Sequence, residues 1–166
     1  MSTTVRHPEP LVAFQGNPGV FDAHSGSTDS YIAANYLNAG PGGNVSNWLI
    51  SPVLLLDQYT NITFYTRTEN PAVYADSIEV RISTNGASTD VGATDTSVGD
   101  FSTLILSVNP LLDPAGYPTS WTKVSATLSS AGEPGERPDR NPVRVAGYQH
   151  QWRLHRNRLA QPFRRA

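Results

Sequence analysis

The chain has 166 residues, of which only 16% are charged, with 13 glycines, 13 prolines, no cysteine and a formal net charge of −2. The length suits one domain, and the lack of cysteine excludes a disulfide framework, a thiolate metal site and a cysteine nucleophile. The abundance of turn-forming residues favours β structure over helices, and without an apolar run of roughly 18 residues no transmembrane segment is expected.

The charge is distributed unevenly along the chain. Residues 1–131 carry four basic and eleven acidic side chains, whereas residues 132–166 carry eight arginines, no lysine and three acidic side chains. The net charges of the two segments are therefore −7 and +5. This asymmetry sets the C-terminal segment apart from the rest of the chain.

The first informative stretch is "FDAHSGSTDSYIAANY", residues 21–36. Asp22, His24 and Ser25 have the composition of a catalytic triad, but a nucleophilic serine must lie within hydrogen-bond reach of an oriented imidazole. Neighbours in an extended chain point to opposite faces. We therefore expect "SGS" to form a turn leading into a strand over "SYIAANY", and a hydrolase using His24 and Ser25 is the less favoured alternative.

The apolar run "NWLISPVLLL", residues 47–56, is interrupted by a proline. We expect a strand that ends at Ile50, a kink at Ser51 and Pro52, and a second short strand that ends at Leu56.

Three aromatic residues of these stretches offer a candidate binding platform, namely Trp48, Tyr31 and Tyr36. The alternative for Trp48 is burial in the core, which is common for tryptophan in so apolar a run. No catalytic residue is assigned.

Four later stretches predict strands. "NITFYTR" and "DSIEVRIS" alternate apolar and polar side chains, and "FSTLILSV" (101–108) and "WTKVSATLS" (121–129) follow. After "DSIEVRIS", Asn85 and Gly86 are expected to supply positive-φ residues for a hairpin or a sharp loop. Strands at this spacing predict a sandwich or a jelly roll.

Asp90, Asp95 and Asp100 in "TDVGATDTSVGD" are a candidate calcium site, because hard cations take carboxylate and backbone oxygens from flexible loops. Their spacing does not match the EF-hand pattern. A solvated surface loop is the favoured alternative.

The spacing of aromatic and apolar residues in the basic C-terminal segment predicts an amphipathic helix. Tyr148, Trp152, His155 and Leu159 recur at spacings of a helix, with arginines between them. Such a segment predicts a nucleic-acid-binding or membrane-binding alternative, although specific nucleic-acid recognition is not expected.

Together "AHSGS", "NWLISP" and "DSIEVRISTNG", in that order, resemble the cleaved-adhesin or choice-of-anchor J family of bacterial secreted and surface proteins, which is similar to MAM-type jelly rolls. The resemblance covers about residues 14–128. It implies a jelly-roll β-sandwich, an extracellular parent protein, a non-catalytic binding or adhesion role toward a protein, matrix or carbohydrate ligand, and in the intact family domain structural Ca²⁺. The N-terminus lacks the layout of a secretory signal peptide.

Both termini depart from the family pattern, and shifted reading frames would restore it. One admissible set of codons for "RLHRNRL", residues 153–159, spells "DYIGIDS" when read one base later, which is similar to the closing strand of the family. One admissible set of codons for residues 1–10, read from its third base, gives "VNNSSPPGA", similar to the loop that precedes the Trp-Phe-Gln-Gly-Asn stretch of the family. We hypothesise that the residues up to about Val12 and those from about Ser130 onward are translated out of frame relative to an ancestral gene, and the nucleotide sequence tests this.

The sequence thus predicts an all-β protein. An atypical segment (1–12) is followed by a jelly-roll β-sandwich (13–129) that is incomplete at both ends. The predicted tail (130–166) is rich in arginine and disordered or weakly helical.

Overall fold

The computed structural model describes residues 14–34, 44–55, 60–72, 74–128 and 142–152. All regular elements within these ranges are β-strands, so the predicted all-β class is confirmed. The same ranges hold no helix with the length and apolar composition needed to cross a membrane.

The larger sheet has the strand order β3-β9-β6-β7, and all its neighbouring strands are antiparallel. A further short strand, β4, pairs with the beginning of β9. The strands are β3 (Val45–Ile50), β4 (Leu54–Leu55), β6 (Ala75–Ser83), β7 (Thr103–Val108) and β9 (Pro142–Trp152).

A second layer is the antiparallel ribbon of β5 (Thr60–Thr66) and β8 (Thr122–Leu128). The predicted alternation is confirmed: in β5, Ile62 and Phe64 are half-buried, whereas Thr63 and Tyr65 are exposed. Ile62 packs against Ile82 of the larger sheet, as do Ile105 and Val145. The two layers therefore enclose a core between them, as in a β-sandwich.

The short strands β1 (Phe14–Gln15) and β2 (Ile32–Ala33) form a separate antiparallel pair. The strand expected over "SYIAANY" is thus short in the structure, and its part from residue 35 lies outside the described residues.

The kink predicted between β3 and β4 is confirmed. Both strands pair with β9, and Ser51 connects them by donating its N–H to Val145 O (2.9 Å) and accepting the Val145 N–H on its Oγ (3.1 Å). The serine hydroxyl takes the place of a backbone acceptor where the chain turns away. Pro52, which has no N–H to donate, is tolerated because the ladder is already interrupted there.

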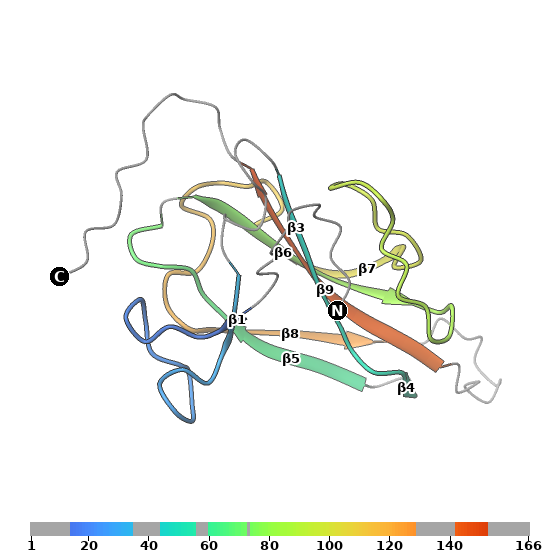
Figure 1. The fold of residues 1–166 in the computed structure, drawn as a ribbon, viewed down its shortest axis with the longest axis horizontal. Helices are drawn as coiled ribbons and strands as arrows, with labels where there is room; N and C mark the ends of the chain where they lie inside the picture. The colour runs from blue at the N-terminus through green and yellow to red at the C-terminus, as the bar shows by residue number, and fades with distance from the viewer. Residues whose placement is uncertain (1–13, 35–43, 56–59, 73, 129–141, 153–166) are drawn as a thin grey trace.

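The strand β9 corrects the prediction for the C-terminal segment. Residues 142–152 were expected to belong to a disordered or weakly helical tail, but they form the strand between β3 and β6 (Figure 1). Ala146 pairs with Ile50 on one side and with Arg81 on the other, and its side chain is fully buried. The sandwich therefore extends beyond residue 129.

The other face of the larger sheet is covered by the long connection between β6 and β7, residues 84–102. Val91 and Phe101 of this connection pack with Trp48 and Ala146 in one buried cluster. Of the predicted turn pair, Gly86 has a positive φ (51°) and Asn85 does not. The sharp loop is therefore confirmed, whereas a tight hairpin is not formed.

A buried tyrosine ties the connection between β7 and β8 to the ribbon. Tyr117 is 6% exposed and its hydroxyl lies 2.5 Å from Thr66 Oγ1. Burial raises the pKa of Tyr117 to about 12, with the hydrogen bond to Thr66 acting in the opposite direction and the charge of Asp76 adding to the rise. The neutral phenol is thus the form that the folded protein accommodates.

This burial predicts a loss of stability at alkaline pH. The contribution of Tyr117 is fully present below pH 10, the ordinary pKa of tyrosine, and is lost as the pH rises toward 12, because only the unfolded chain releases the proton there. We expect the loss to be about 2 to 3 kcal/mol. Chemical denaturation at a series of pH values between roughly 9 and 12, an interval that spans both pKa values, measures this loss of unfolding free energy. In Tyr117→Phe this part of the pH dependence should be missing, and equal slopes in both proteins would contradict the prediction.

Candidate binding surface

The stretch around His24 forms a turn, as predicted. The Ala23 N–H donates to Thr28 O (2.9 Å), and Gly26 adopts φ 84°, a conformation that favours glycine. The turn brings residues 21–31 back toward the ribbon of β5 and β8.

Aromatic rings hold this turn against the ribbon. The rings of Phe21 and Tyr31 stack with centroids 4.9 Å apart, and Trp121, directly before β8, meets each of them edge-on at 5.7 Å. The indole Nε1 of Trp121 also donates to Asp22 O (2.8 Å). The guanidinium of Arg67 lies 4.3 Å from the centre of the Phe21 ring. Stacked and edge-on pairs of this kind are the favoured aromatic geometries.

Two rings of the same cluster face solvent. The imidazole of His24 stacks on the ring of Tyr65 with centroids 3.6 Å apart, and it lies edge-on to Trp121 at 6.3 Å. Tyr65 is 40% exposed and His24 is exposed. We call Phe21, His24, Tyr31, Tyr65 and Trp121 the aromatic surface.

The geometry around His24 does not assemble a nucleophilic triad. Among the described residues, no hydrogen bond joins His24 to Ser25 or to Asp22. The imidazole of His24 instead stacks on the ring of Tyr65. Asp22 contacts Trp121, not His24, and it does so through its backbone carbonyl. What the arrangement exposes to solvent is the pair of stacked rings of His24 and Tyr65.

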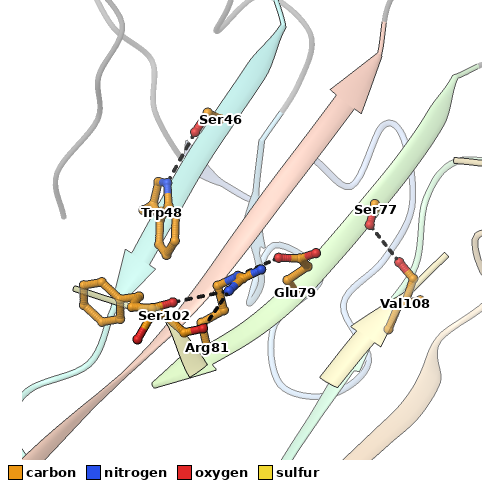
Figure 2. A network of polar contacts seen from close by, with 8 residues as sticks. Ser46, Trp48, Ser77, Glu79, Arg81, Ser102 and Val108 are labelled. Carbon is orange, nitrogen blue, oxygen red and sulfur yellow. Dashed lines mark hydrogen bonds and ion pairs between the residues drawn. The ribbon is translucent and has the colours of Figure 1, made fainter. Parts of the chain in front are cut away.

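The predicted platform of Trp48, Tyr31 and Tyr36 is not brought together. Trp48 is 1% exposed and packs against Phe101, and Figure 2 shows its Nε1 donating to Ser46 Oγ (3.3 Å). Its indole therefore belongs to the core, as the alternative reading held. Tyr31 lies in the aromatic surface, and Tyr36 is outside the described residues.

The carboxylates of Asp90, Asp95 and Asp100 bind separate partners in the 84–102 connection. Asp90 Oδ1 accepts the Gly92 N–H (2.8 Å), and Asp95 Oδ2 accepts from Asn44 Nδ2 (2.5 Å). The described ranges contain no group of three or more carboxylate or histidine side chains placed to hold a metal ion. The predicted calcium site is therefore corrected to three hydrogen-bonded loop residues.

The side chain of Asp100 accepts hydrogen bonds from two residues near the beginning of the connection. Its Oδ2 accepts from Ser88 Oγ (2.5 Å) and from Asn85 Nδ2 (2.8 Å). These hydrogen bonds, that of Ser88 first, lower the pKa of Asp100 below its ordinary value. The carboxylate thus stays charged and fastens the two ends of the connection to each other.

A second polar contact fastens the end of this connection to the sheet. Arg81 of β6 pairs with Glu79 (Nε to Oε2, 2.7 Å), and its Nη1 donates to Phe101 O and to Ser102 O (3.4 Å each) (Figure 2).

The predicted amphipathic helix is wrong where the structure describes it, because Tyr148 and Trp152 belong to β9. His155 and Leu159 lie outside the described residues, as do seven of the eight arginines of residues 132–166. The eighth, Arg144, is half-buried within β9. This side chain is part of the sheet and cannot serve a flexible basic tail.

Sequence reasoning missed Phe21, Tyr65 and Trp121 as members of one surface. The only local signal is the position of Tyr65 in "NITFYTR": it falls among the alternating polar residues, so its large ring lies on the solvent-facing side of the strand. Trp121 contacts a turn 99 positions earlier in the chain, which no spacing reveals. No family model matches this chain, and no curated protein or solved structure matches it.

Proposed function

We propose that the protein is a non-catalytic, extracellular binding or adhesion module and that its ligand contacts the aromatic surface. The observation that carries this proposal is the exposed stack of His24 on Tyr65, held by the packed rings of Phe21, Tyr31 and Trp121. Aromatic side chains fixed in place lose little conformational entropy on binding and supply large contact areas.

The extracellular setting is supported by the resemblance to the cleaved-adhesin or choice-of-anchor J family. "AHSGS" contributes the turn that carries His24, and "NWLISP" contributes β3 with its kink. The two-layer arrangement suits the jelly roll that the resemblance implies.

Among the ligand classes that the resemblance leaves open, we favour carbohydrate. The ring of Tyr65 combines an apolar face with a hydroxyl, and its neighbours in the ribbon, Thr63 and Lys123, are exposed and polar. A sugar ring offers the complementary combination of a C–H face and a hydroxylated rim, so it stacks and forms hydrogen bonds at once. Protein and matrix ligands are the other outcomes of the test.

Binding to a glycan array and to immobilised collagen tests this proposal. Tyr65→Ala is expected to weaken binding by about tenfold, the equivalent of about 1.4 kcal/mol. Leu49→Ala is the matched control, because Leu49 is exposed to a similar extent (49%) but belongs to the larger sheet. Thermal melts establish that both variants are folded.

Three results would overturn the proposal. One is equal binding by wild type and Tyr65→Ala, and the second is the absence of binding to every probe. The third is turnover of a chromogenic ester or glycoside that is lost in His24→Ala, because it would make His24 a catalytic group.

A further inference from the structure

The pair Asn85–Gly86 stands apart from the other asparagine positions of the chain. It is the only asparagine followed by glycine, and four others, at 17, 70, 109 and 141, precede proline. A proline nitrogen carries no hydrogen and cannot attack a neighbouring amide. A glycine nitrogen is the least hindered backbone nucleophile, because glycine has no side chain to obstruct its approach.

The structure leaves this pair accessible. Asn85 is exposed, and apart from Gly86 itself and its two chain neighbours no heavy atom lies within 4 Å of the position that a Cβ of Gly86 would occupy. Gly86 adopts φ 51° at the beginning of the 84–102 connection. No hydrogen bond among the described residues is donated by the Gly86 N–H. Its nitrogen is therefore free to approach the side chain of Asn85.

We propose that Asn85–Gly86 is a modification site at which the protein deamidates without an enzyme. The Gly86 nitrogen loses its proton to water and forms a bond to Asn85 Cγ, while the bond from Cγ to Nδ2 breaks and ammonia leaves. Water then opens the cyclic imide at either carbonyl, which yields aspartate or isoaspartate at position 85. Water is the only co-reactant, and no group is oxidised or reduced.

The contacts of Asn85 turn this reaction into a structural switch. Its Nδ2 donates to Asp100 Oδ2 (2.8 Å), so the amide is the donor of a hydrogen bond to a carboxylate. The product is itself a carboxylate, which has no proton to donate. Two negative charges then face each other where a hydrogen bond had been.

The repulsion acts on the part of the connection that covers the sheet. Asp100 directly precedes Phe101, which is fully buried against Trp48. The Asp100 N–H also donates to Asp90 O (3.0 Å), which closes the base of the loop. Deamidation of Asn85 therefore loosens residues 84–102 from the face that contains Trp48.

The first test measures the reaction itself. Purified full-length protein is kept in mildly alkaline buffer, and peptides containing Asn85, Asn44 and Asn61 are quantified over time by mass spectrometry, with an isoaspartate methylation assay. We expect the Asn85 amide to be lost several-fold faster than the other two, since valine and isoleucine follow Asn44 and Asn61. Equal rates at the three positions would overturn the proposal.

The second test measures the switch with three variants: Asn85→Asp, Asp100→Asn and the double substitution. Asn85→Asp is expected to lower the Tm by roughly 2 to 4 °C. The double variant should recover most of this loss, because the new amide at position 100 can donate to the new carboxylate at position 85. A Tm of Asn85→Asp equal to wild type, or a double variant no more stable than Asn85→Asp, would show that the contact does not hold the connection in place.

Discussion

Replacing Ala146 with aspartate is expected to unfold the protein. Ala146 is fully buried in β9 and packs in the cluster of Trp48 and Phe101, so a carboxylate there would lose its hydration without gaining a partner. An uncompensated buried charge costs about 3 to 5 kcal/mol. This is comparable to the whole stability of many domains, about 5 to 15 kcal/mol.

Circular dichroism and urea denaturation measure this effect. Thr63→Asp is the control, because Thr63 is an exposed strand position in β5 and surface substitutions change stability by about 0.5 kcal/mol or less. If Ala146→Asp unfolds at the same urea concentration as wild type, then β9 does not occupy the centre of the sheet.

Truncation of Phe101 to alanine is the second large expected effect. Phe101 is fully buried, with its ring centroid 5.5 Å from that of Trp48. Removing a buried phenylalanine side chain destabilises a core by about 3 to 5 kcal/mol, through lost transfer free energy and the cavity that remains. Phe101 lies near the end of the 84–102 connection. Its truncation should therefore weaken the packing of the whole connection against this face of the sheet.

The free energy of unfolding from urea denaturation measures this loss, and the emission of Trp48 should shift to longer wavelength as water reaches it. Leu111→Ala is the control, since Leu111 is 90% exposed and no cavity forms on its truncation. Similar losses in both variants would show that the connection contributes little to the core.

The strands that the sequence predicted correctly are those with a short-range pattern of apolar and polar residues. In β5 and β8 a two-residue period marks one buried face, and the proline in "NWLISPVLLL" marks the break between β3 and β4. The period in β6 predicted the strand but not its burial, because Ser77 and Ser83 are buried together with Val80 and Ile82. These features depend on neighbours within a few positions, which is why the amino-acid sequence alone could predict them.

The prediction for β9 failed because its pattern is ambiguous. Positions 148 and 152 are four apart, and residues at that spacing share a face in a helix and in a strand alike. Partners decide between the two structures, and here β3 and β6 supply hydrogen bonds on both sides. The aromatic surface was missed for a similar reason, because Trp121 and the turn at Asp22 meet only through the fold.

The frame-shift hypothesis remains a prediction for both termini. β9 lies within the part of the chain that the hypothesis places out of frame. Backbone hydrogen bonds of a sheet do not depend on which side chains are present, so a strand there is compatible with either origin. Codons for residues 153–159 that do not spell "DYIGIDS" in the neighbouring frame would refute it.

The position of β9 in the sheet also has a kinetic consequence. It is the last described strand along the chain, yet it separates β3 from β6, and Trp48 pairs with a residue 100 positions later. During synthesis the facing edges of β3 and β6 stay without this partner until residues 142–152 have emerged from the ribosome. Contacts between such distant residues slow folding, and strand edges left open in the meantime favour association between nascent chains. Expression at lower temperature, or with a chaperone that shields these edges, should therefore raise the yield of soluble protein.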